Sequence, residues 1–144
     1  MSEIHDKILT KFGYPETKII EYKFWYWLLR PMQTTLGSSI VVIKNHVESI
    51  HKLESKIFTE LHEIFSEIEL TLKRTFDYDK INYLMLMMDD PTLHYHVIPR
   101  YKNDKILDGK KYIDIGYPGI PNLSYDNDNN QLHEIKLKIV KNKY

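Results

Sequence analysis

Polar and apolar side chains alternate along one stretch of the chain, Thr92-Leu93-His94-Tyr95-His96-Val97-Ile98-Pro99-Arg100. Alternation with a period of two predicts a β-strand, and Pro99 removes a donor from its hydrogen-bond ladder. Because successive residues of a strand point to opposite faces, one face carries Thr92, His94, His96, Ile98 and Arg100. The opposite face is apolar and is expected to pack beneath a helix. Two imidazoles and a guanidinium are thus presented together on a rigid platform.

The segments around this strand alternate between predicted helices and strands. Residues 2–12 predict a short helix, capped by Ser2 and ended by Gly13-Tyr14-Pro15. Aromatic and β-branched residues from Lys18 to Arg30 predict a strand, and Ser39–Ile43 predicts a second strand that pairs with it as a hairpin. Apolar residues recur every three or four positions over residues 52–76, which predicts a long amphipathic helix.

The later segments predict one more strand and a third helix. Lys80–Met88 is apolar at nearly every position, which is typical of a strand covered on both faces, and its methionines are interpreted as core filler. Residues 116–121 are expected to be irregular and residues 126–130 to form a hydrophilic loop. Residues 131–140 fit helical spacing, although Ile135, Leu137 and Ile139 also alternate; a helix is predicted.

Composition excludes several classes of protein. The 144 residues fit one domain, and twenty basic against twenty acidic residues remove the general attraction to nucleic acid phosphates. The absence of cysteine excludes disulfides, a thiol nucleophile, an iron–sulfur cluster and a cysteine zinc site. The acidic N-terminus lacks the pattern of a secretion signal, and the longest apolar run, Phe24–Leu29, is too short to span a bilayer. We therefore expect a cytoplasmic protein without nucleic acid or membrane partners.

Three interpretations of the paired histidines are open. They can be surface residues of an edge strand. They can chelate a metal together with His46, although zinc needs a third protein ligand and no cysteine or nearby Glu motif supplies one. Finally, a neutral imidazole can attack phosphorus while a neighbouring His and Arg stabilise the transferring group.

The stretch Asp90–Tyr101 resembles the signature of the histidine triad (HIT) superfamily, in which His-φ-His-φ-His-φ-φ is followed by Pro and Arg. Residues 37–50 resemble the glycine, strand and Lys/Arg-His-Val region ahead of the family's helix, and residues 78–83 resemble the start of its penultimate strand. The likeness covers about residues 18–101. It implies an α+β fold with an antiparallel sheet of about five strands, one long helix packed on it and a C-terminal helix. A single HIT-like domain, 1–144, would have its core at 18–101 and a C-terminal extension at 102–144.

The resemblance also implies a function. HIT proteins are nucleotide hydrolases and transferases, usually homodimers, and no cofactor or metal is expected. The implied substrate is a nucleoside phosphoramidate or dinucleoside polyphosphate with a purine mononucleotide moiety. His94 matches the nucleophile that attacks the α-phosphate and forms a nucleotidyl-histidine, and His96 matches the last triad histidine, which contacts phosphate oxygens. Asn82 matches an asparagine of the preceding strand, His46 a histidine at the pocket edge, and Arg100 the arginine that follows the triad.

The chain departs from the family pattern at three places. Thr92 stands at the first triad position, so a neutral hydroxyl replaces an imidazole among the catalytic residues. Met88-Asp89-Asp90 replaces an upstream glutamine, and carboxylates repel phosphate unless they are protonated or turned away. Arg30 stands near the expected ribose-holding position and is interpreted as a phosphate ligand. An alternative function is therefore a catalytically weak nucleotide-binding module that retains the pocket.

Overall fold

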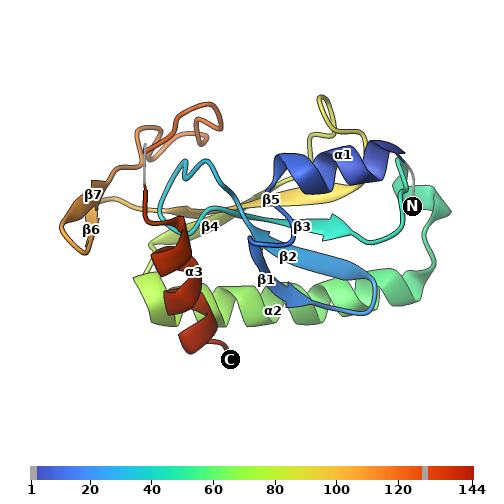
Figure 1. Ribbon diagram of the computed structural model, residues 1–144, viewed down its shortest axis with the longest axis horizontal. Coiled ribbons are helices and arrows are strands. Elements are labelled where there is room, and N and C mark those ends of the chain that lie inside the picture. The colour runs from blue at the N-terminus through green and yellow to red at the C-terminus, as the bar shows by residue number, and fades with distance from the viewer. Residues whose placement is uncertain (1–2, 128–129) are drawn as a thin grey trace.

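A computed structural model describes residues 3–127 and 130–144. Five antiparallel strands form one sheet in the order β1-β2-β3-β5-β4, and a second, two-stranded sheet follows it (Figure 1). The elements are α1 (Glu3–Lys11), β1 (Lys18–Glu21), β2 (Trp25–Leu29), β3 (Ser39–Ile43), the 3₁₀ turn η1 (Ile50–Lys52), α2 (Ser55–Phe76), β4 (Lys80–Leu84), β5 (His94–Arg100), β6 (Lys105–Leu107), β7 (Lys110–Tyr112) and α3 (Leu132–Lys141). The predicted α+β class, the antiparallel sheet and the helices are confirmed. The predicted cap Ser2 and part of the 126–130 loop lie outside the described residues.

Helices cover both faces of the sheet, and the sequence of the central strands explains why. Every residue of β2 and of β3 is buried, because alternate side chains enter two different clusters. Trp25, Trp27 and Leu29 belong to the larger cluster with residues of α2, whereas Tyr26 and Leu28 belong to a smaller cluster with residues of α1. Figure 1 shows α1 and α2 on opposite sides of the sheet.

The predicted single strand from Lys18 to Arg30 is wrong, since this segment is a hairpin of β1 and β2. The chain reverses at residues 22–24, where the amide of Tyr22 donates to the carbonyl of Trp25 at 2.8 Å. The amide of Phe24 donates to the Glu60 carboxylate of α2 at 2.7 Å, so a long-range contact satisfies the turn. No Gly or Pro marks this turn. The predicted pairing with Ser39–Ile43 is confirmed for β2, whose Trp25 lies opposite Ile43.

The strand predicted over Lys80–Met88 is shorter and more exposed than expected. β4 ends at Leu84 and is an edge strand with half-buried side chains, so it is not covered on both faces. Met87 has a positive φ of 52°, and Met88 is 86% exposed, which corrects its interpretation as core filler. Residues 85–93 instead form the connection to β5, and β5 continues through Pro99, which lies opposite Ile81.

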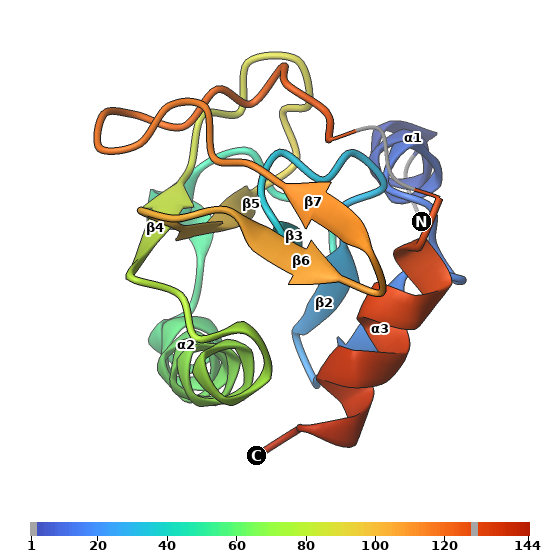
Figure 2. The same ribbon diagram turned by 90° about the vertical axis from the view of Figure 1, so that its left-hand side faces the viewer.

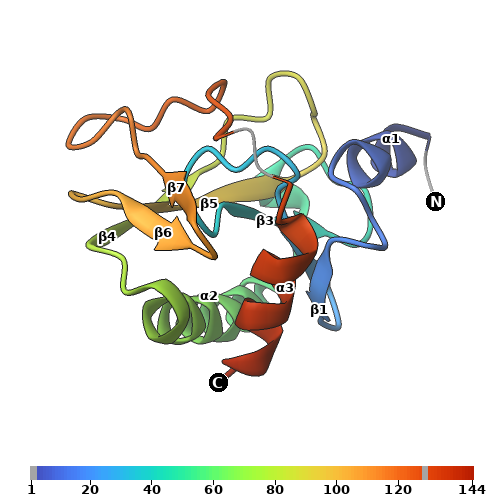
Figure 3. The same ribbon diagram turned by 60° about the vertical axis from the view of Figure 1, so that its left-hand side comes forward.

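The C-terminal residues close one end of the molecule. Ile135 and Ile139 of α3 are fully buried, which confirms the helical spacing, and α3 lies beside α2 (Figures 2 and 3). The β6–β7 hairpin was not predicted, although Asp108-Gly109 joins its strands and both residues have positive φ, 47° and 81°. An Asp-Gly pair between two strands is a turn signal of this kind.

Candidate active site

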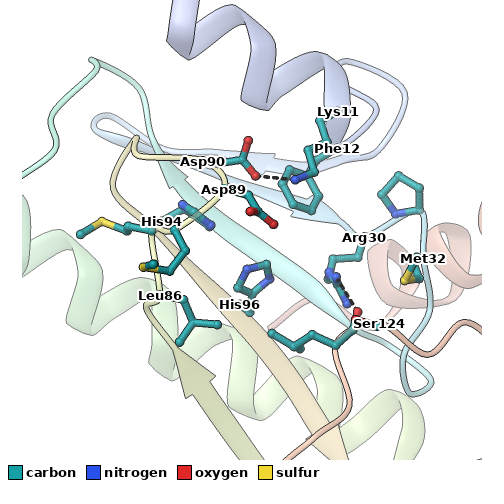
Figure 4. A pocket seen from close by; sticks show the side chains of 14 residues that line it. Lys11, Phe12, Arg30, Met32, Leu86, Asp89, Asp90, His94, His96 and Ser124 are labelled. Atoms are coloured by element: carbon teal, nitrogen blue, oxygen red, sulfur yellow. Dashed lines mark hydrogen bonds and ion pairs between the residues drawn. The ribbon is translucent and has the colours of Figure 1, made fainter.

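A cavity of about 640 Å³ opens on the α1 side of the sheet. It collects residues from the end of α1, the start of the β2–β3 loop, the β4–β5 connection, β5 and the segment before α3 (Figure 4). Its lining residues are Lys11, Phe12, Arg30, Pro31, Met32, Leu86, Met87, Met88, Asp89, Asp90, His94, His96, Leu123 and Ser124. The sequence analysis names four of these polar residues that are buried or half-buried in the structure: Arg30, Asp90, His94 and His96.

The two histidines of β5 share the cavity. Both line its wall from the same face of the strand, and their ring centroids lie 5.0 Å apart. His94 is 2% exposed and His96 is 8% exposed. These values contradict the interpretation of the pair as surface residues.

A backbone contact sets the proton position on His94. Its Nδ1 lies 2.6 Å from the carbonyl oxygen of Thr92, and a carbonyl only accepts, so Nδ1 carries the proton. Burial lowers the pKa of His94, against the opposing effect of the Thr92 carbonyl, and the ring is therefore neutral near pH 7. A neutral ring protonated at Nδ1 has its lone pair on Nε2, which is the form required of a nucleophile.

The second histidine is held still further from protonation. Burial, with smaller contributions from the Arg30 and His94 charges, lowers the pKa of His96 to about 3. Within residues 3–127 and 130–144, its buried Nδ1 has no hydrogen-bond partner. His96 is thus a neutral donor or acceptor at physiological pH.

Arg30 supplies a buried positive charge. Its Nη1 donates to the Thr34 hydroxyl at 2.7 Å and its Nη2 to the Leu123 carbonyl at 3.4 Å. Burial lowers the pKa of Arg30 to about 10, opposed by the charge of the Asp126 carboxylate, so the guanidinium stays charged at pH 7. Because both hydrogen bonds go to neutral oxygens, the charge can attract an anion in the cavity.

Thr92 and His46 contact each other beside the cavity rather than lining it. Thr92 is fully buried, and its hydroxyl lies 2.7 Å from His46 Nδ1. The other ring nitrogen of His46 lies 3.1 Å from the Glu48 carboxylate. Thr92 therefore meets the site through its backbone carbonyl, and its side chain anchors the segment that carries His46.

Asn82 and Arg100 lie together in a separate hollow of about 570 Å³. Arg100 Nε and Nη2 donate to the two carboxylate oxygens of Asp114 at 2.7 and 3.1 Å, and Nη1 donates to Asn82 Oδ1 at 2.7 Å. The structure does not bring these two residues to the histidine cavity. The partner Asp114 stands after β7, in a segment where no helix or strand is predicted from the sequence.

Two side chains that line the cavity, Lys11 and Phe12, are not predicted from the sequence as site residues. Lys11 forms an ion pair with Asp90 at 2.7 Å, and the Phe12 ring lies 6.4 Å and 6.1 Å from the rings of His94 and His96. No local pattern marks Lys11 or Phe12, because their place in the cavity depends on how α1 packs.

The described part of the chain does not assemble the metal site that was considered. Within it, no three His, Cys, Asp or Glu side chains gather closely enough to hold a metal ion. His46 contacts Thr92 and Glu48, while His94 and His96 face the cavity. In addition, none of the helices in this part of the chain has the length and apolar character needed to cross a membrane.

Solved structures with this fold include several that are named histidine triad proteins. A histidine triad protein from Marinobacter aquaeolei has a TM-score of 0.67 and 22% identity, covering 100% of this chain and 99% of its own. A hypothetical histidine triad nucleotide-binding protein from Sulfolobus tokodaii has a TM-score of 0.68 and 18% identity, covering 98% of this chain and 91% of its own. A zinc-bound histidine triad family protein from Mycobacterium smegmatis has a TM-score of 0.65 and 17% identity, covering 94% of this chain and 88% of its own.

At these identities the likeness shows the fold. Comparison with curated proteins gives no match. Residues 14–103, more than half of the 144-residue chain, match the HIT domain, so the chain belongs to the HIT domain family.

Proposed function

We propose that this chain is a nucleotide phosphohydrolase or nucleotidyl transferase that works through a covalent nucleotidyl-His94 intermediate. The proposed substrates are nucleoside phosphoramidates and dinucleoside polyphosphates. One observation carries the proposal. The Thr92 carbonyl holds the proton on Nδ1 of His94, so the lone pair of this cavity-lining ring is on Nε2. The Sulfolobus tokodaii protein is named a hypothetical histidine triad nucleotide-binding protein, and this name supports the same ligand class.

The reaction has two displacements at one phosphorus. His94 Nε2 attacks the α-phosphorus, a P–N bond forms, and the leaving group departs with the electron pair of its own bond; an amine takes up a proton from the solvent as it leaves. A water molecule then attacks the same phosphorus, the P–N bond breaks with its electron pair returning to Nε2, and a proton of the water passes to the solvent. The Arg30 guanidinium and the neighbouring His96 ring stabilise the charge on the phosphoryl oxygens.

The site favours this chemistry because it keeps the nucleophile neutral. Burial lowers the pKa of His94, so protonation does not remove the Nε2 lone pair at neutral pH. Once phosphorylated, an imidazole is a good leaving group, because the displaced ring is again neutral. We assign a supporting role to Asn82, Arg100 and His46. Arg100 of β5 bonds to Asn82 of β4 and to Asp114, and His46 contacts Thr92 just ahead of β5.

A second candidate is a catalytically weak nucleotide-binding module. The observation that favours it is the pair of carboxylates at the mouth: Asp89 and Asp90 both line the cavity, and Figure 4 shows Asp89 pointing into the space beside the two histidines. An ionised carboxylate there opposes an incoming phosphate. A third candidate, a metal-dependent hydrolase, takes support from the zinc-bound Mycobacterium smegmatis structure alone.

Turnover and binding separate these candidates. We expect the wild type to hydrolyse adenosine 5′-phosphoramidate or diadenosine triphosphate, and His94→Ala to lose about a thousandfold or more in kcat. His62→Ala, an exposed histidine of α2, is the matched control and keeps wild-type turnover. AMP binding by calorimetry without turnover of either substrate would favour the module, and loss of turnover with a chelator would favour the metal enzyme. The homodimer and the cytoplasmic location stay predictions.

A further inference from the structure

Helix α1 adds two side chains to the cavity from outside the part of the chain that matches the HIT domain. The match begins at residue 14, whereas Lys11 and Phe12 stand at the end of α1 and both line the cavity. The apolar face of α1 packs on β2 and β3 in the smaller core cluster, and the ring of Phe12, which follows the helix, lies 6.4 and 6.1 Å from the rings of His94 and His96. One wall of the cavity is therefore built by residues outside the HIT-domain match.

One carboxylate holds Lys11 at the mouth of the cavity. Lys11 Nζ lies 2.7 Å from Asp90 Oδ2, although 79 positions separate the two residues in sequence. The Lys11 side chain is 49% exposed, while that of Asp90 is 12% exposed, so the ammonium faces the solvent that an incoming ligand replaces. An ammonium has three donors, so it can hold Asp90 with one and bind an anion with another. Asp90 thus fixes the position of the ammonium and leaves its other N–H donors to an anion.

The direction of attack places a leaving group near this charge. In a displacement at phosphorus, the attacking and leaving atoms are roughly in line. Figure 4 shows Lys11 and Arg30 on one side of the cavity and His94 on the other, with Asp89 between them. A group that His94 displaces toward that side meets the Lys11 ammonium, which stabilises a leaving group that gains negative charge.

We propose that Lys11, positioned by Asp90, binds the leaving phosphate, so that the chain prefers nucleotides with a phosphate leaving group over phosphoramidates of a neutral amine. This inference rests on the proposed function. As the P–N bond forms at His94, the bond from the α-phosphorus to the bridging oxygen breaks and its electron pair stays on that oxygen. The departing phosphate carries the new negative charge, which Lys11 pairs. Water then cleaves the P–N bond, and its proton passes to the solvent.

The test compares two substrates in matched lysine variants. The substrates are diadenosine triphosphate and adenosine 5′-phosphoramidate, and the readout is the ratio of their kcat/KM values. In Lys11→Met we expect this ratio to fall about tenfold or more, and Lys11→Arg, which keeps the charge, to restore most of it. Lys7→Met is the control, because Lys7 is exposed on the same helix; it keeps the wild-type ratio.

Binding supplies a readout that does not depend on turnover. In a His94→Ala background, calorimetry gives the affinities for AMP and for diadenosine triphosphate, and adding Lys11→Met is expected to weaken the second about tenfold relative to the first. Equal losses for the two ligands, or an unchanged kcat/KM ratio, would overturn the inference. A wild type that hydrolyses neither substrate would remove the proposed function, and the binding ratio would still decide the role of Lys11.

Discussion

Removing the imidazole of His96 is expected to flatten the pH dependence of stability. In the folded chain, burial lowers the pKa of His96 from 6.5 to about 3. Between these two values the unfolded chain binds a proton that the folded chain refuses, so the free energy of unfolding decreases as the pH falls from neutrality toward 3. The stabilising effect of the neutral ring is complete above pH 6.5, the pKa of the unfolded chain.

The size of the effect follows from this difference. At pH 5 the cost of keeping the ring neutral is RT ln(1 + 10^1.5), or about 2 kcal/mol. The result barely depends on the folded pKa, because pH 5 lies well above 3. Since the residue is only 8% exposed, solvent does little to screen the effect.

Urea unfolding at pH 7 and pH 5 measures this change in the free energy of unfolding. We expect wild type to lose about 2 kcal/mol more than His96→Asn between these two pH values, whatever the absolute stability of the variant. His62→Asn removes an exposed histidine of α2 and keeps the wild-type difference. An identical pH dependence in His96→Asn and wild type would refute the conclusion that burial keeps His96 neutral.

Three further substitutions test the cavity and the frame around it. Arg30→Met removes the buried charge and is expected to weaken AMP binding about tenfold or more in calorimetry, whereas unchanged affinity would show that Arg30 does not meet the phosphate. Thr92→Val removes the hydroxyl that His46 contacts and is expected to lower the free energy of unfolding in urea by about 1 kcal/mol; equal stability would contradict that contact. Gly37→Ala forces a side chain into a positive φ of 88° and places its Cβ 3.1 Å from the Phe76 ring. We expect it to cost about 2 kcal/mol in the same assay, and a neutral result would mean that the ring moves aside.

The sequence predicts the parts of the fold that depend on local periodicity. The spacing of apolar residues gives α2 and α3, and the β-branched run gives β3, because these patterns are set by the geometry of single elements. The hairpin of β1 and β2 was missed because its turn, residues 22–24, is satisfied by Glu60 from α2 and carries no turn residue. Over residues 85–88, apolar composition predicts a strand, yet these residues connect β4 to β5, and residues 86–88 line the cavity.

Some residues of the site are predictable from local sequence patterns, and others are not. The alternation in β5 predicts that His94 and His96 share a face, and the structure places both in one cavity. It predicts the same face for Arg100, but that guanidinium binds Asp114 from a distant segment. Lys11 reaches the cavity through the packing of α1, and long-range packing of this kind leaves no pattern in the neighbouring residues.

The covalent adduct is the most direct test of the central claim. Wild type and His94→Ala are mixed with diadenosine triphosphate or adenosine 5′-phosphoramidate, quenched in alkali within one turnover, and digested for mass spectrometry. We predict a nucleotidyl group on the peptide that contains His94, at the histidine itself, lost on brief acid treatment and absent from His94→Ala. Turnover by the wild type with no adduct, or with an adduct on another residue, would contradict the claim that His94 is the nucleophile.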